Sequence, residues 1–266
     1  MHKLGIMQGR LLPDDINYLQ YYPSKKWKEE LSFAEAIGFD YVELLYDINQ
    51  SNQNPLVNIN KCNELQAELT KNRLVNYSIC ADYFTKDPLF FAFDKLFELI
   101  DISNSIGNSM IIIPLLNGNN CSGNDFDRLL KLIKPIVEDI KNKDLKILFE
   151  ISLDAKTAVK ILNRNQTNVS ICYDFGNATA FGHNISEEII YLKDYLNHVH
   201  LKDRVRNGGP NVLLENGNVD FTSGFKALKE IGYTGNFTLE TATGTEPIES
   251  AKNHYLFAKN HISTLL

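Results

Sequence analysis

Short apolar runs rich in β-branched and aromatic residues recur along the whole chain, and this repetition constrains the fold more than any other feature. Each run has four to six residues, and most are bounded by Gly, Asn or Asp, as buried strands commonly are. The eight runs occupy residues 4–7, 41–44, 74–79, 109–113, 146–150, 169–174, 198–201 and 237–240.

Segments between these runs carry apolar residues at three- and four-residue spacing, which is the period of an amphipathic helix. In the first segment Trp27, Leu31 and Ala34 share one face, Ser24 is the candidate N-cap, and Gly38 ends the helix. Similar patterns occupy residues 65–69, 96–106, 129–140, 185–192, 225–231 and 248–265. Strands that alternate with helices, without a long linker, predict parallel βαβ units.

The length favours closure of these units into one barrel. The chain has 266 residues, and a (β/α)8 barrel typically has about 250. An open doubly wound sheet is the alternative, but no Gly-x-Gly-x-x-Gly motif follows the first run. We therefore expect an α/β protein, a (β/α)8 TIM barrel whose single domain spans residues 1–266.

Composition excludes several classes of protein. The net charge of −6, with no block rich in Lys or Arg, argues against nucleic-acid binding. No stretch approaches the roughly 20 apolar residues of a membrane span, and the N-terminus does not resemble a signal peptide. The cysteines form no Cys-x-x-Cys pair, so we expect reduced thiols in a cytoplasmic protein; they are Cys62, Cys80, Cys121 and Cys172.

Ionisable residues stand at or near the ends of four consecutive runs, where a barrel of this kind carries its chemistry. They are Glu150, Asp174, His200 and Glu240. Asp174 alone could simply shape a turn, but four such residues in succession favour a shared site. Three carboxylates and one imidazole suit one divalent metal ion, most naturally Mn, Mg or Co, with Zn also possible.

Because side chains alternate along a strand, the residues two positions before and after His200 lie on the same face as His200. His198 is then expected one layer deeper in the barrel, as a buried histidine or as a partner of a metal ligand. Lys202 is expected at the barrel mouth near the substrate, or in an ion pair with Asp203 or with a neighbouring strand.

Several motifs give the chain a recognisable likeness over nearly its whole length. They lie at residues 5–10, 37–43, 173–177, 198–203, 217–221 and 232–235. With them the chain resembles the xylose isomerase-like TIM-barrel superfamily, which is described as sugar phosphate isomerases and epimerases.

The resemblance implies a role for each strand-end residue. In ketose 3-epimerases of this superfamily, four such residues bind one metal ion and the two glutamates handle protons. Carried over, Glu150 and Glu240 are the acid/base pair, and Asp174 and His200 are ligands only. The implied reaction removes a proton next to a carbonyl, passes through an enediolate, and returns a proton from the opposite face.

Further residues are candidate substrate contacts. The family usually has a histidine three residues after the strand-six aspartate, where this chain has Asn177, with His183 further on. An arginine after strand seven often contacts substrate, and Arg204 and Arg206 both qualify. Lys202 is a further candidate, and sugar hydroxyls could bind side chains near the ends of the first three strands, namely Gln8, Glu43 and Asp82.

We therefore expect an isomerase or epimerase that acts on a ketose or sugar phosphate. A lyase of the inosose dehydratase type and a non-catalytic sugar-binding relative are the alternatives. Gly-rich loops at residues 206–210 and 241–245 could hold a phosphate. A DNA-repair nuclease would need several more strand-end histidines than the six in this chain allow. Many relatives self-associate, so a homodimer or homotetramer is expected.

Overall fold

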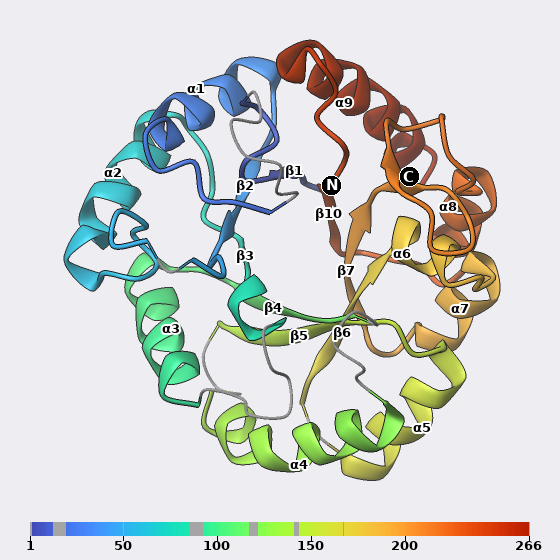
Figure 1. Cartoon of the computed structure of the whole chain (residues 1–266). Helices are drawn as coiled ribbons and strands as arrows, with labels where there is room; N and C mark the ends of the chain where they lie inside the picture. Colours follow the sequence, from blue (N-terminus) through green and yellow to red (C-terminus); the bar gives the residue numbers. More distant parts are fainter. Residues whose placement is uncertain are drawn as a thin grey trace.

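Eight parallel strands close into a barrel, with helices forming an outer ring (Figure 1). The computed structural model describes residues 2–12, 20–49, 51–85, 93–116, 122–140, 144–166 and 168–265. The barrel order is β1-β10-β7-β6-β5-β4-β3-β2. The strands are β1 (Leu4–Met7), β2 (Tyr41–Leu45), β3 (Ser78–Cys80), β4 (Met110–Leu115), β5 (Lys146–Ile151), β6 (Ser170–Asp174), β7 (Leu196–Leu201) and β10 (Asn236–Leu239). The predicted (β/α)8 barrel is confirmed.

The helices bury the apolar stripes that their sequences predict. α4, for example, buries Leu129, Ile133 and Ile136 on one face. The helices are α1 (Trp27–Ile37), α2 (Cys62–Lys71), α3 (Phe93–Ile106), α4 (Gly123–Ile140), α5 (Ala155–Asn165), α6 (Phe175–Ala180), α7 (Ile185–Leu192), α8 (Phe221–Glu230) and α9 (Pro247–Ser263). Short 3-10 turns η1 (Ile59–Lys61) and η2 (Asp82–Thr85) and a two-stranded sheet of β8 (Asp203–Arg204) and β9 (Asn211–Val212) complete the described elements.

The predicted start of the first helix is wrong, and its predicted end is right. Residues 24–26 form a turn, in which Ser24 N donates to the carbonyl of Tyr22, and α1 begins only at Trp27. Ser24 therefore does not cap the helix. Gly38 does end it, in the left-handed conformation (φ 108°) that a residue without a Cβ adopts without strain.

Strand alternation divides β7 between two environments. Val199 and Leu201 belong to the apolar layer between strands and helices. His198 and His200 point into the barrel and are fully buried. The sequence-based expectation that both histidines share the inner face is confirmed.

The described helices include none with the length and apolarity that a bilayer crossing demands. Cys62, Cys80 and Cys172 are buried and form no disulfide, whereas Cys121 lies outside the described residues.

Candidate active site at the barrel mouth

The structure brings the four strand-end residues Glu150, Asp174, His200 and Glu240 together. Strand register explains this, because Asp174 pairs with His200 across β6 and β7, and Thr238, two residues before Glu240, pairs with His200 from the other side. One ligand atom from each of the four residues lies within 4.8 Å of all the others, and all four residues are buried.

This spacing fits a single divalent ion. Oxygen and nitrogen ligands lie roughly 2.0–2.6 Å from such ions, so two ligands on opposite sides of one ion are about 4–5 Å apart. Three carboxylates and one imidazole are also donors that Mn, Mg, Co and Zn accept. The geometry therefore supports one metal ion held by the four residues.

Lys202 lies among the same carboxylates rather than at the surface. Its Nζ is 2.7 Å from Glu240 Oε1 and 3.2 Å from Asp174 Oδ2, and its side chain is buried. Asp203 instead accepts backbone N–H groups of Gly217 and Val219. Lys202 was expected to pair either with Asp203 or with a neighbouring strand. It pairs with Asp174 and Glu240, which lie at the ends of neighbouring strands.

The two glutamates have different surroundings. Burial, followed by the charges of Glu240 and Asp174, raises the pKa of Glu150 to about 8. Burial also acts to raise the pKa of Glu240, but Lys202, His200 and Arg10 together outweigh it and hold that pKa well below its usual range. The two glutamates of the cluster therefore differ in their affinity for a proton, which Glu150 holds more tightly than Glu240 does.

Asn177 and Arg204 extend the cluster toward the loops. Asn177 Nδ2 donates to Glu150 Oε1 at 2.6 Å, and Asn177 Oδ1 accepts from Arg204 Nη1 at 2.8 Å. Asp174 also caps α6 by accepting from the backbone N–H of Asn177, so its turn-forming role and its place in the cluster coexist. Arg204 is therefore linked to Glu150 through the side-chain amide of Asn177.

A cavity of ≈ 350 Å³ opens beside the cluster. Its size lies in the range of small-molecule sites. Most of its lining residues are polar or charged, and burial, followed by the charge of Glu240, raises the pKa of Asp82 to about 6. The cavity is lined by Gln20, Asp82, Pro114, Leu116, Glu150, Asn177, Lys202, Arg204, Pro210, Asn211 and Glu240.

Sequence reasoning missed Gln20. Gln20 Nε2 donates to Glu240 Oε1 at 2.8 Å, and Arg10 Nη2 donates to Gln20 Oε1 at 3.0 Å. No periodicity or spacing identifies a glutamine in a loop. Its partner Arg10 lies in one of the motifs that carry the resemblance, so Arg10 was the sequence signal that could have led to Gln20.

The remaining predicted substrate contacts do not line this cavity. Gln8 is buried and accepts from Leu45 N, and Glu43 is buried beneath the cluster against His200. His183 and Arg206 line a separate cavity of ≈ 410 Å³ near the start of α7 and α8.

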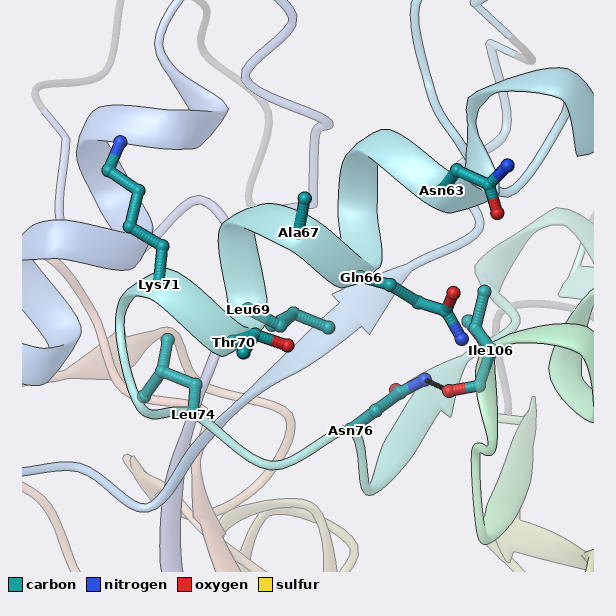
Figure 2. A pocket seen from close by; sticks show the side chains of 9 residues that line it. All are labelled: Asn63, Gln66, Ala67, Leu69, Thr70, Lys71, Leu74, Asn76 and Ile106. Atoms are coloured by element: carbon teal, nitrogen blue, oxygen red, sulfur yellow. Dashed lines mark hydrogen bonds between the residues drawn. The ribbon is translucent and has the colours of Figure 1, made fainter.

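A larger cavity, ≈ 710 Å³, lies outside the barrel, between α2 and the end of α3 (Figure 2). Of the nine residues that line it, only Lys71 is ionisable. It offers no acid/base pair, so we assign the chemistry to the barrel mouth.

Comparisons with known proteins agree with this fold. The family model described as "Xylose isomerase-like TIM barrel" matches residues 31–260. The Haemophilus influenzae protein named "Putative L-ribulose-5-phosphate 3-epimerase SgbU" is 25% identical over 285 aligned residues, covering 93% of this chain and 92% of that protein.

Solved structures share the fold at low identity. D-psicose 3-epimerase from Clostridium cellulolyticum H10 superposes with a TM-score of 0.73 at 14% identity, covering 97% of this chain and 98% of that one. The probable 3-DHS dehydratase AsbF from Bacillus anthracis gives a TM-score of 0.69 at 17% identity, covering 96% and 98% of the two chains.

Proposed function

The chain belongs to the xylose isomerase-like TIM-barrel family, and from that premise we propose that it is a metal-dependent isomerase or epimerase of a ketose or sugar phosphate. The observation that carries the proposal is the convergence of three carboxylates and one imidazole beside a cavity lined largely by polar and charged residues. The name of the Haemophilus influenzae relative supports an epimerase that acts on a sugar phosphate.

In this proposal Glu150, Asp174, His200 and Glu240 hold one divalent ion, with Mn, Mg or Co favoured and Zn possible. Such an ion, when bound, acts as a Lewis acid that polarises a carbonyl and stabilises negative charge on the neighbouring oxygens. The closeness of the four ligand atoms supports this donor set.

Glu150 and Glu240 act as the acid/base pair. One glutamate takes the proton from the carbon next to the carbonyl, which leaves an enediolate. The other glutamate returns a proton to the opposite face of that carbon, so its configuration inverts and no atom is lost. Both side chains line the cavity and they come from different strand ends, which supports attack from two sides.

The cavity lining supports a small, hydroxyl-rich substrate. Lys202, Arg204, Asn177 and Asp82 offer donors and acceptors around it, and Arg204 can also pair with a phosphate. Substrate contact by the residues outside this lining stays a prediction; they are Gln8, Glu43, His183 and Arg206.

A lyase remains the alternative, because dehydration of an inosose-like substrate begins with the same proton abstraction. The probable dehydratase from Bacillus anthracis has the same fold. A non-catalytic sugar-binding protein is less favoured, because burying Glu150, Asp174, Glu240 and Lys202 together costs stability that simple binding does not require.

We further propose that residues 1–266 work as one domain on a small molecule in the cytoplasm, as a homodimer or homotetramer, without nucleic acid or membrane. The net charge of −6 and the absence of a spanning helix among the described residues support the last point.

The test is a metal-supplemented screen of ketoses, pentulose phosphates and inososes in deuterated water, followed by NMR. An isomerase or epimerase incorporates deuterium into a product of otherwise unchanged mass, whereas a lyase releases water. Absence of exchange with every substrate, together with absence of divalent-ion binding, would overturn the proposal.

A further inference from the structure

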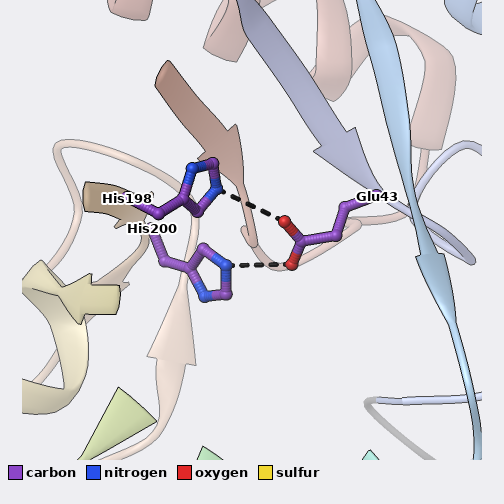
Figure 3. Close-up of side chains that lie close together, drawn as sticks. All are labelled: Glu43, His198 and His200. Carbon is purple, nitrogen blue, oxygen red and sulfur yellow. Dashed lines mark ion pairs between the residues drawn. The ribbon is translucent and has the colours of Figure 1, made fainter. Parts of the chain in front are cut away.

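Glu43 lies beneath the candidate metal site, at the centre of a fully buried polar network (Figure 3). Its Oε1 is 2.9 Å from His200 Nε2, and its Oε2 is 3.3 Å from His198 Nε2. Oε2 also accepts from Ser78 Oγ at 2.7 Å and from Thr238 Oγ1 at 2.9 Å. These contacts tie β2 to β3, β7 and β10.

We propose that Glu43 is a positioning residue that orients His200 and selects the tautomer in which its Nδ1 can bind a metal ion. A carboxylate only accepts hydrogen bonds, so the 2.9 Å contact with Glu43 favours a proton on Nε2. With that proton on Nε2, the lone pair of the neutral ring stands on Nδ1. This inference rests on the proposed function and deepens its metal site.

The other side of the imidazole faces the acidic cluster. His200 Nδ1 lies 3.0 Å from Glu240 Oε2 and 3.7 Å from Glu150 Oε2. Nδ1 therefore faces the place where the carboxylates converge, and a metal ion bound there would take the place of the proton that Nδ1 directs at Glu240. A carboxylate behind a ligating histidine fixes the ring and raises the basicity of the ligating nitrogen.

The two carboxylate oxygens of Glu43 have different contacts. Oε2 is held by the hydroxyls of Ser78 and Thr238 and by His198, whereas Oε1 contacts His200. Thr238 is itself anchored, because its Oγ1 lies 2.8 Å from His198 Nε2 and 3.0 Å from the Tyr41 hydroxyl and can accept from either. This arrangement fixes the carboxylate plane and so the direction of the His200 ring.

Glu43, His198 and His200 could instead hold a metal ion themselves, since their ligand atoms also lie within 4.8 Å of one another. The contacts favour a positioning network. His198 Nε2 already lies 2.8 Å from Thr238 Oγ1, and all three side chains are fully shielded from solvent. Metal stoichiometry separates the two arrangements.

The experiment titrates Mn²⁺ into metal-stripped protein by calorimetry, for the wild type, Glu43→Gln and a control. We expect one ion per chain for the wild type and a roughly 10- to 100-fold weaker affinity for Glu43→Gln. The control Glu188→Gln changes another largely buried carboxylate beside an imidazole, His183 Nδ1 at 3.0 Å, and should leave affinity unchanged. Equal affinity in wild type and Glu43→Gln overturns the proposal, as does a second ion that Glu43→Gln removes.

A second readout is nitrogen NMR of histidine-labelled protein loaded with Zn²⁺. The wild type should show His200 protonated at Nε2, and protonation at Nδ1 would contradict the inference.

If circular dichroism shows that Glu43→Gln does not fold, the variant Ser78→Ala provides the test instead. Removal of one donor to the same carboxylate should weaken Mn²⁺ binding several-fold, and unchanged binding overturns the inference.

The outcomes distinguish this inference from the function on which it rests. A wild type that binds no divalent ion removes the proposed metal site and the role of Glu43 together. A wild type that binds one ion, with Glu43→Gln equally tight, removes only the positioning role.

Discussion

The ammonium of Lys202 lies 2.7 Å from a carboxylate oxygen of Glu240, inside the cluster that we assign to a metal ion. Asp174 contributes a second oxygen 3.2 Å from the same nitrogen. Lys202 therefore supplies positive charge to two of the carboxylates that a divalent ion would use. Because the ammonium and the metal ion would interact with the same carboxylates, substitution of Lys202 is a sensitive test of the site.

Replacement of Lys202 by methionine should separate metal binding from turnover. Removal of a cation beside the ligands should tighten Mn²⁺ binding, whereas loss of a buried charge near the reacting atoms should lower kcat by roughly 100-fold or more. Calorimetry and steady-state kinetics measure the two effects. Lys146→Met, at the opposite end of a barrel strand, is the control, and weaker Mn²⁺ binding in Lys202→Met would contradict the expectation.

Glu150→Gln and Glu240→Gln should each abolish turnover while the fold is retained. Each substitution removes a group that can take up and release a proton, a contribution of about 100- to 10,000-fold. Turnover is measured by NMR and the fold by circular dichroism and thermal unfolding. Full activity in either variant would remove that residue from the acid/base pair.

His200→Ala should sharply weaken divalent-ion binding, because it deletes the only nitrogen among the four candidate ligands. Metal content after dialysis and titration with Mn²⁺ both report the effect. His254→Ala provides a comparison, since His254 is a buried histidine of α9 outside the cluster. Unchanged metal content in His200→Ala would refute the ligand role.

Arg204→Ala and Arg206→Ala distinguish the two arginines that the sequence left open. Arg204 lines the cavity and contacts Asn177, whereas Arg206 lines a different cavity. Arg204→Ala should therefore raise KM more than Arg206→Ala, and neither should change Mn²⁺ affinity as much as His200→Ala. The reverse order of KM values would show that substrate reaches the Arg206 cavity.

Glu30 should make stability depend on pH. Burial raises its pKa to about 7, although the backbone N–H groups of Leu11 and Gly9 act to lower it. Because the folded pKa exceeds the unfolded one, the folded state holds this proton more tightly. The resulting stabilisation is complete below the unfolded pKa and is lost as pH rises through 7, by up to about 3 kcal/mol.

Glu30→Gln should flatten this dependence, because an amide does not titrate. Chemical unfolding at pH 5 and pH 8 measures the change, and Glu29→Gln, an exposed neighbour on α1, is the control. An identical pH slope in wild type and Glu30→Gln would show that this glutamate titrates normally.

The periodicity of the sequence predicted the barrel because each strand and helix carries its own apolar pattern. Boundaries were less accurate. The run at 74–79 was assigned to a strand, but the barrel strand is Ser78–Cys80, since the chain from Leu74 first packs behind α2, with Val75 N bonded to the carbonyl of Asp40. Local pattern indicates a strand but not where it enters the sheet.

The strand pattern alone predicts that Glu150, Asp174, His200 and Glu240 lie near one another, because parallel strands in a closed barrel all end at the same rim. The side chains that surround these four residues could be identified only from the folded protein. Glu43 faces His200 from across the barrel interior, and Gln20 reaches Glu240 from a distant loop. Such contacts depend on strand register, side-chain direction and loop path, which arise from the packing of the whole chain and leave no periodic mark in any single segment.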